Sequence, residues 1–566
     1  MYLNFTVKIP DVAGKLLYEK RGEITYVKYE YDRVYVPEKK YTLPKRATIG
    51  KVSLSDNSMM QPNETFFKYF PEVEFPKELS HANRSSCLRV GAHIVIQNII
   101  REYGLDELLG CYFNEKDLGL FLDLATYSII AENNAGQYYP DYAYNHPLFT
   151  KEMQIYSDSK VSDFLQSITE NQSVGFLNEW NAGRNHREKI YISYDSTNKN
   201  CQAGDFALVE YGKPKTDVGL PVFNYSIAFD MKHREPLFYE KYPGSIVDTS
   251  QLKLMLDKAQ GYGYKRVGFI LDRGYFSKAN IDYMDSCGYS FVIMVKGMAE
   301  LVDSLIMEHK GSFESKRACD MDGFGVYGKT VKRKLYETDE KERYFHIYHN
   351  EAKRAAERTR FEAKLKKMQR YLTANTGKEL RFGNEFHKYF YLHYDKEIFV
   401  YPEEKVSITE HKIDLCGYFV IITSEKMSAK DALHLYKSRD CSEKLFRGDK
   451  TYLGDKSLRV HTTESASAKI FIEFIALIIR NKIYTCLIDE MKNMEKKPNY
   501  MTVPAALKEL EKIEMVRQTD NIYRLDHAVT ATQKKILKAF GLTENYIKHK
   551  ADDISGQLKK IQRNKR

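Results

Sequence analysis

The sequence lacks any pair of cysteines at the short spacing of a metal-binding or redox motif. Its 566 residues include eight cysteines, which are scattered along the chain without a Cys-x-x-Cys pair. This pattern excludes a zinc ribbon or zinc finger and argues against a disulfide scaffold. We therefore expect free thiols, as in a reducing cytoplasm.

Long apolar runs are also absent. The most apolar stretch, Ile470–Leu487, is broken by charged residues, and its longest pure run, Phe474–Ile479, is far too short to cross a bilayer. The first residues, Met1–Leu17, contain Lys8 and Asp11 and so have no apolar segment of the kind that a secretory signal needs. We expect no membrane partner, and we expect the Ile470–Leu487 stretch to be a buried core helix.

What is present is an ordinary globular composition with a basic excess. Hydrophobic residues make up 43% and charged residues 29% of the chain, and the net charge is +10. A basic excess is compatible with nucleic acid but does not establish it, because many basic proteins bind no polyanion.

The N-terminal region alternates polar and apolar residues. The alternation over Thr25–Tyr31 and Arg33–Val36 predicts strands in a β-rich region spanning residues 1–80. Aromatic and basic residues interleave there, which suits either a DNA-contacting hairpin or an ordinary two-sided surface sheet.

Helical periodicity follows. Apolar residues recur at helical spacing over Leu88–Tyr103 and Asp117–Ala131, whereas the tyrosine- and asparagine-rich stretch Asn133–Asn145 predicts a loop. No clear helix-turn-helix signature is present, so this helical region, residues 81–186, could recognise DNA or simply pack.

Between residues 187 and 297 the pattern changes to strands interleaved with helices. Helices are expected from Asp248 or Thr249 and over Ser277–Ser286. The order fits a meander of antiparallel strands joined to a parallel extension. The strand-like runs are Ile190–Asp195, Phe206–Tyr211, Val222–Asp230, Leu237–Tyr242, Arg266–Asp272 and Tyr289–Val295.

A different segment, residues 298–412, interrupts this pattern. The charged sequence Glu351–Arg370 predicts a helix, and its composition favours a solvated helix face over a DNA clamp. Short aromatic strands are expected at Tyr344–Tyr348 and Tyr389–Leu392. The earlier pattern resumes with a strand at Gly417–Thr423.

Acidic residues stand at three informative places. Asp195 and Asp272 each end a strand-like run and lead into turn-like sequence, where binding sites commonly lie. A helix opened by a capping box at Ser428 carries the third acid, Glu443. Three carboxylates at one end of a sheet can hold two divalent cations, which clamp the attacking and leaving oxygens of an in-line phosphoryl transfer.

The third acid shares its helix face with other polar residues. At about 100° per residue, Tyr436, Arg439, Glu443 and Lys450 fall on one side of the helix. Such a face is too polar for a core, and on spacing alone it could be an exposed face with incidental charge pairs.

These residues resemble the DDE transposases of bacterial insertion sequences, within the insertion-sequence-four superfamily. That group is marked by Tyr-(2)-Arg-(3)-Glu-(6)-Lys, and every gap matches between Tyr436 and Lys450. The Asp-Arg-Gly-Tyr sequence that starts at Asp272 is similar to the second-acid motif of the family, and Asp195 with Ser196 and Thr197 is similar to the first. The resemblance covers about residues 187–490.

The resemblance implies an α/β chain with a ribonuclease-H-like catalytic core, interrupted by a β-rich insertion domain and preceded by a β-then-helical N-terminal region. It implies that Asp195, Asp272 and Glu443 are catalytic and bind two Mg²⁺ ions, for which Mn²⁺ would substitute. Phosphate would be gripped by Tyr436, Arg439, Lys450 and Arg273.

The resemblance also implies partners and a location. The partners would be double-stranded DNA, both as transposon-end inverted repeats and as target, and a second copy in a homodimer on paired ends, in the bacterial cytoplasm at the nucleoid. The predicted division of the chain is 1–80, β-rich; 81–186, helical and DNA-binding or end-recognising; 187–297, first part of the core; 298–412, insertion; 413–515, second part of the core with the glutamate helix; and 516–566, a basic helical tail.

Two other functions stay open at this point. A ribonuclease-H-like nuclease would cut DNA without joining it, and a transposase-derived DNA-binding protein would bind without cutting. The signature helix and the long interval between the second and third acids favour the transposase.

Overall fold

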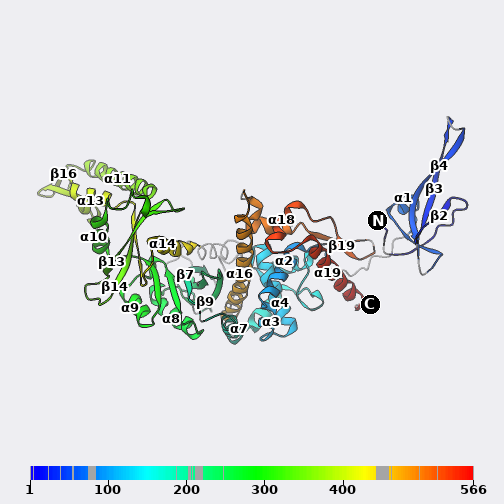
Figure 1. Cartoon of the computed structure of the whole chain (residues 1–566), viewed down its shortest axis with the longest axis horizontal. Helices are drawn as coiled ribbons and strands as arrows, with labels where there is room; N and C mark the ends of the chain where they lie inside the picture. Colours follow the sequence, from blue (N-terminus) through cyan, green and yellow to red (C-terminus); the bar gives the residue numbers. More distant parts are fainter. Residues whose placement is uncertain are drawn as a thin grey trace. The chain divides into compact units, whose positions relative to one another are not determined.

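The protein is described by a computed structural model that covers the chain except residues 1, 4, 23, 38–39, 54–55, 74–83, 187, 202–205, 207, 211–220, 247, 441–457, 461, 496–497, 519 and 565–566. The chain divides into two compact units. The first comprises Met1–Phe164 and Lys482–Arg566, and the second comprises Leu165–Asn481. Sheets and helices occur in both, so the fold is mixed α/β, as expected (Figure 1).

The first unit begins with an antiparallel sheet in the order β1-β5-β4-β3-β2. The alternation at Thr25–Tyr31 lies within its long strand β3, as predicted. Val27, Ile49 and Met60 form a small core under α1, whose first turn is capped by the side chain of Asn63. The elements are β1 (Val7–Lys8), β2 (Leu16–Arg21), β3 (Ile24–Val36), β4 (Tyr41–Val52), β5 (Met59–Pro62) and α1 (Glu64–Tyr69).

Helices make up most of the remainder of the first unit, and two sequence predictions need correction there. The helix expected from Leu88 starts only at Gly91, because Cys87–Arg89 instead pairs as β6 with β18 (Glu514–Arg517). The loop expected at 133–145 contains α5 (Tyr139–Asn145), which buries Tyr139 and Tyr142. The other helices before the second unit are α2 (Gly91–Glu102), α3 (Leu105–Gly110), α4 (Glu115–Ala131), η2 (Gly136–Tyr138), η3 (Lys151–Met153) and α6 (Asp158–Ser167).

The C-terminal residues complete the first unit. Strand β18 lies between β6 and β19 (Tyr523–Leu525), so the sheet joins residues from the two ends of the chain. The last helix, α19 (Glu544–Asn564), buries Ile547, Ala551, Ile554 and Leu558, so this basic tail packs rather than being merely solvated. Between them lie η6 (Asn499–Met501), α17 (Val503–Leu510) and α18 (Ala531–Ala539).

The second unit is built on a nine-stranded sheet in the order β12-β13-β14-β17-β11-β10-β7-β8-β9. Strands β7, β8 and β9 form an antiparallel meander, and β10 and β11 run parallel to β7. The predicted meander with a parallel extension is therefore confirmed. The bounds are β7 (Ile190–Asn200), β8 (Val222–Asp230), β9 (Glu235–Pro243), β10 (Val267–Leu271), β11 (Ser290–Met294), β12 (Asp320–Met321), β13 (Val326–Lys334), β14 (Glu342–His349) and β17 (Tyr418–Thr423).

Two helices cover one face of this sheet. Leu433 and Tyr436 of α14 (Ala429–Ser438) pack with Ile270 and Val292. Phe474 of α16 (Thr463–Lys492) lies 5.0 Å, between ring centroids, from Tyr239 of β9. The apolar stretch at 470–487 is thus a buried helix, as predicted. Other helices of this unit are α7 (Glu170–Ala182), α8 (Asp248–Gly261), η4 (Arg273–Tyr275), α9 (Lys278–Ser286), α10 (Ala299–His309) and η5 (Arg317–Cys319).

The segment between residues 298 and 412 contributes in two ways. Strands β12, β13 and β14 pair into the main sheet through β17. A separate small core, which includes Leu372, Phe390 and Phe399, joins α11 to a two-stranded sheet. The elements of this part are α11 (Glu351–Thr373), α12 (Asn384–Tyr389), β15 (Phe390–Asp395), β16 (Ile398–Glu404) and α13 (Val406–Asp414).

One predicted strand did not form as expected. In the stretch Phe206–Tyr211 the described residues make only an isolated bridge, between Glu210 and Val222. Alternation alone did not reveal this, because the preceding strand β7 continues to Asn200 and takes the pairing along β8 instead. Across the described part of the chain, no helix combines the length and the apolar character needed to span a membrane.

Candidate active site

Asp195 and Asp272 come from neighbouring parallel strands. In the pairing of β7 with β10, Tyr194 stands opposite Leu271, the last residue of β10, and an aspartate comes next on each chain segment. Asp272 follows the end of β10, but Asp195 does not end its strand as predicted, because β7 keeps pairing with β8 as far as Asn200. Because paired strands lie about 5 Å apart and side chains alternate between faces, the two carboxyl groups project from the same face. This is the face that α14 and α16 cover, and both aspartates are partly exposed on it.

Local hydrogen bonds orient each carboxylate. The backbone N–H of Ser196 donates to Oδ1 of Asp195 at 2.9 Å. The N–H of Arg273 donates to Oδ1 of Asp272 at 2.8 Å, so that Asp272 caps the short helical turn η4. A side-chain hydrogen bond from α9 stabilises this turn, because the amide of Asn280 donates to the carbonyl of Tyr275 at 2.9 Å.

Arg439 reaches Asp272 from the end of α14. Its guanidinium Nη1 lies 3.5 Å from Oδ1 of Asp272, and its side chain is only 14% exposed. The guanidinium carbon also lies 5.6 Å from the ring centroid of Tyr436. The arrangement places a fixed positive charge beside the second acid.

Tyr436 has a different environment from the one expected. It is 7% exposed and belongs to the core cluster beneath α14, so the prediction that this helix face is too polar for a core is wrong at this position. The Tyr436 ring packs against sheet residues and also contacts the guanidinium of Arg439. Of the two side chains, only that of Arg439 is shown to reach Asp272.

The remaining predicted site residues are placed less fully. Glu443 and Lys450 lie outside the described residues, so their relation to the two aspartates stays a prediction. Arg273 follows Asp272 directly and is exposed. Within the described residues, no three His, Cys, Asp or Glu side chains come together as a metal-binding group.

Sequence reasoning missed a group of buried charges on the same face. Lys199 lies on β7 four residues after Asp195, is fully buried, and places its Nζ 3.6 Å from Oε2 of Glu473 on α16. The same Nζ lies 4.2 Å from the ring centroid of Tyr225. Lys469, one turn before Glu473, is also buried, and burial lowers its pKa to about 8, against the opposing effect of Glu473.

A signal for this group did exist in the sequence. Lys469 and Glu473 are spaced four apart within an otherwise apolar helix, where charges are unfavourable unless they are paired. Their partner on β7 could not be deduced from spacing, because Lys199 is far away in the sequence.

The described residues on either side of 441–457 contact the two strands that precede or carry the aspartates. Before this segment, Arg439 contacts Asp272. After it, the N–H of Leu458 donates to the carbonyl of Asn200 at 3.2 Å, and Lys469 donates to the carbonyl of Leu458.

Comparison with known proteins gives one strong match. The model of the transposase DDE domain family matches residues 190–479, which is more than half of the chain. That range contains both aspartates, Arg439 and the whole nine-stranded sheet. A search of curated proteins found no match.

Solved structures give weaker likenesses. The piggyBac transposase synaptic complex with hairpin DNA is 7% identical, with 82% of each chain covered and a TM-score of 0.34. The Mos1 transposase paired-end complex with the left transposon end is 14% identical over 40% of this chain and 65% of that chain, with a TM-score of 0.13. A pre-cleavage Mos1 transpososome is 12% identical over 40% and 66%, also with a TM-score of 0.13.

Scores this low do not establish a shared fold, so the assignment depends on the family model. The residues that it matches are those that form the sheet and hold the two aspartates. The chain therefore belongs to the transposase DDE domain family.

Proposed function

We propose that this transposase binds the terminal inverted repeats of its own element, cuts the DNA there in a metal-dependent reaction and joins the freed 3′ ends to target DNA. The observation that carries the proposal is that Asp195 and Asp272 directly follow the paired residues Tyr194 and Leu271 of two parallel strands, with Arg439 beside the second acid. Family membership supplies the class of reaction.

The proposed core has a ribonuclease-H-like topology. Support comes from the five strands β9-β8-β7-β10-β11, which form a three-stranded meander followed by two strands parallel to its first member. The predicted insertion, residues 298–412, would then enter between the second and third acids. The insertion-sequence-four assignment rests on the spacing of Tyr436, Arg439, Glu443 and Lys450.

The donor set fits a hard divalent cation. Asp195 and Asp272 offer carboxylate oxygens on one partly exposed face, and oxygen ligands are those that Mg²⁺ prefers. Together with Glu443 they would hold two Mg²⁺ ions, or Mn²⁺ in their place. When bound, such a pair stabilises the charge on the attacking and leaving oxygens of the phosphodiester.

The protein's own residues then do three things. The backbone donors at Ser196 and Arg273 hold the carboxylates of Asp195 and Asp272 in fixed orientations. Arg439, whose guanidinium lies near the Tyr436 ring, can rotate away from Asp272 and form a bidentate contact with a DNA phosphate. Lys450 and the exposed Arg273 would add point charges along the backbone of the end DNA.

The partner and location follow from the same proposal. The enzyme would act on double-stranded DNA as a homodimer that holds two paired ends, at the nucleoid of a bacterial cell. The N-terminal sheet and the helices of residues 81–186 would contribute end recognition.

The test is cleavage of DNA that carries the flanking ends of the gene, with Mg²⁺ and with a chelator. Asp272→Asn, Asp195→Asn and Glu443→Ala should each abolish cutting while DNA binding stays within a few-fold of wild type. The matched control is Asp282→Asn, an exposed acid on α9 that should leave cutting unchanged.

Each alternative gives a distinct result. Cutting at the ends without joined products would indicate a nuclease. Binding without cutting by the wild type, on correct ends, would indicate a DNA-binding protein derived from a transposase. Full activity in Asp272→Asn would refute the assigned role of the acids.

A further inference from the structure

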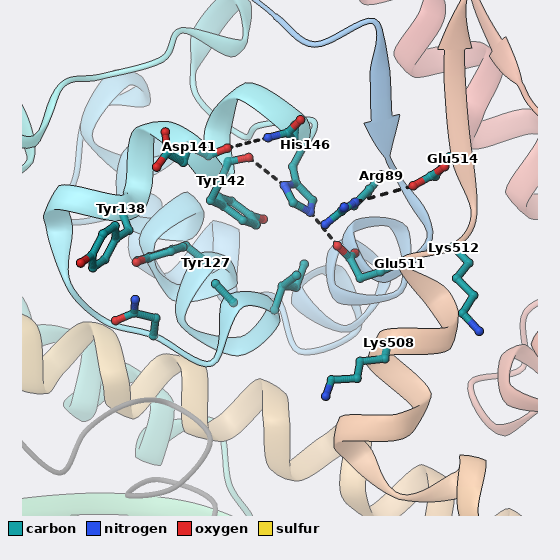
Figure 2. A pocket seen from close by; sticks show the side chains of 14 residues that line it. Arg89, Tyr127, Tyr138, Asp141, Tyr142, His146, Lys508, Glu511, Lys512 and Glu514 are labelled. Atoms are coloured by element: carbon teal, nitrogen blue, oxygen red, sulfur yellow. Dashed lines mark hydrogen bonds and ion pairs between the residues drawn. The ribbon is translucent and has the colours of Figure 1, made fainter.

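A cavity of about 560 Å³ lies within the first unit. Its walls come from α4, η2 and α5 on one side and from α17 and the chain leading into β18 on the other (Figure 2). The volume is in the range of small-molecule sites. No role has been given to this cavity so far.

The floor of the cavity is fixed by a buried polar pair. His146 is 4% exposed, and its ring nitrogens each face an oxygen at 2.7 Å: Nδ1 faces the carbonyl of Tyr142, and Nε2 faces Oε2 of Glu511. The ring of Tyr142 stacks on the imidazole with 4.1 Å between centroids. These contacts tie α5 to the residue that follows α17, so the cavity is preformed.

One wall offers an aromatic surface. Tyr127 and Tyr142 are almost fully buried, and the hydroxyl of Tyr127 donates to a backbone carbonyl. Tyr138 is different, because it is 46% exposed and stands at the cavity edge (Figure 2). Its ring is therefore available for stacking.

The other wall offers a cation. Lys508 and Lys512 stand across the cavity from the tyrosines (Figure 2). Lys512 pairs with Glu509 at 2.5 Å, whereas no ion pair of Lys508 occurs among the described residues. Lys508 thus provides a positive charge that a ligand can use.

Asn133 also lines the cavity and offers a hydrogen-bond donor. Oδ1 of Asn133 accepts the N–H of Ala135 at 3.1 Å, which fixes the amide and leaves its NH₂ to point elsewhere. Two of the three acids of the lining have basic partners, since Glu514 lies 3.6 Å from Arg89 and Glu511 meets His146; the third acid is Asp141. The cavity therefore combines a ring surface, an amide donor and a free cation.

We propose that this cavity binds one unpaired nucleotide of a DNA strand, with its base stacked on Tyr138 and its phosphate against Lys508. A ring, a hydrogen-bonding edge and an anion occur together in a nucleotide. Bases within a duplex are already stacked on their neighbours, so the nucleotide must be single-stranded or turned out of the helix. That the nucleotide belongs to DNA rests on the proposed function.

The first experiment measures the affinity of the full-length protein for a fluorescently labelled single-stranded oligonucleotide by anisotropy. Tyr138→Ala should weaken binding by about 5-fold to 100-fold, and Tyr138→Phe should retain it, because base stacking on an aromatic ring needs the ring and not the hydroxyl. The matched control is Tyr144→Ala, since Tyr144 is 45% exposed but does not line the cavity.

A second measurement tests the phosphate contact. Lys508→Gln should reduce the slope of log affinity against log salt by about 0.7, the value for one phosphate of a single strand. The control is Lys559→Gln on α19, an exposed lysine outside the cavity. Competition with a free deoxynucleotide monophosphate separates a mononucleotide site from a strand site: full displacement at micromolar concentration would refute strand binding.

The outcomes are distinguishable from those of the proposed function. Equal affinity of Tyr138→Ala and wild type, or an equal loss in Tyr144→Ala, would overturn the cavity assignment even if the enzyme cuts its ends. Unchanged cutting by Asp272→Asn would refute the catalytic proposal and leave a Tyr138-dependent affinity standing.

Discussion

The buried pair of Lys199 and Glu473 allows a quantitative test of how the catalytic strand is held. The side chains are 0% and 2% exposed, with 3.6 Å between Nζ and Oε2. Replacing Glu473 with Leu leaves the buried ammonium without its carboxylate, which costs about 3–5 kcal/mol for such pairs. The Tyr225 ring, 4.2 Å from Nζ, offsets part of that loss, so we expect a value near 3 kcal/mol.

The double variant should behave differently. In Lys199→Met with Glu473→Leu, both members of the pair are replaced by apolar groups of similar size, whereas the buried Lys469 still loses its neighbour Glu473. Replacing a buried pair by apolar groups is often neutral or stabilising, so part of the loss should be recovered. The interaction energy of the double-mutant cycle isolates this coupling.

The assay can use the single tryptophan of the chain. Trp180 lies on α7 in the second unit, is 7% exposed, and donates from Nε1 to the carbonyl of Pro236 at 3.0 Å. Its fluorescence during urea unfolding therefore reports on the unit that contains the pair. A loss near 3 kcal/mol corresponds to a fall of about 1–2 M in the urea midpoint.

An exposed ion pair in the same unit provides the control. Arg358 and Glu362 meet at 2.7 Å on α11 with side chains 53% and 37% exposed. Glu362→Leu should leave the midpoint unchanged, because water screens such pairs. The reasoning would be refuted if Glu473→Leu were neutral, or if the double variant were as unstable as the single one.

Three further predictions concern other parts of the molecule. Burial lowers the pKa of Lys469 to about 8, below its value of 10.5 in an unfolded chain. Between these values the unfolded state binds more protons, so the contribution of Lys469 to stability rises with pH from 8 to 10.5 by on the order of 3 kcal/mol. It should be measured as the difference in urea midpoints, from Trp180 fluorescence, between the wild type and Lys469→Met. Gly268→Ala should lower the free energy of unfolding of the second unit by about 1–3 kcal/mol, because the added Cβ would lie 2.4 Å from Cε1 of Tyr191. Gly274→Ala, whose added Cβ would have no atom within 4 Å, serves as comparison. Asn63→Ala should lower the stability of the N-terminal sheet and α1 by about 1 kcal/mol, because the Asn63 side chain caps α1. Amide hydrogen exchange in that sheet should become faster, whereas the urea midpoint from Trp180 fluorescence should stay unchanged.

The strand-and-helix pattern of the second unit could be predicted from the sequence because each element carries its own signal. Strand β8 has the predicted bounds, Val222–Asp230, and Ser277 and Ser428 cap helices where expected. Where tertiary pairing decided the outcome, prediction failed. The apolar spacing from Leu88 onward predicts a helix, but Cys87–Arg89 forms a strand because Glu514–Val516, far away in the sequence, pair with it.

The candidate site was predictable to a similar degree. Asp272 directly follows the end of β10, as predicted, whereas the prediction that Asp195 ends its strand is wrong, because β7 continues to Asn200. The adjacency of the two acids followed from a parallel pairing that the pattern already suggested. The contact of Arg439 with Asp272 and the burial of Tyr436 could not be deduced, because both depend on how deeply α14 sits on the sheet. The Lys199–Glu473 pair needed the three-dimensional structure for the same reason.

The pairing of β6 with β18 has a consequence for synthesis of the chain. Residues 87–89 meet residues 514–516, so the first unit cannot close until nearly the whole chain has been made. At translation rates of about 5–20 residues per second, that partner strand emerges roughly 20–85 s after β6. During this interval the second unit can fold on the ribosome, whereas the apolar surface of α2 waits for its cover by α17 and α19. A product of premature termination would therefore contain the two aspartates on a folded sheet but lack a completed first unit.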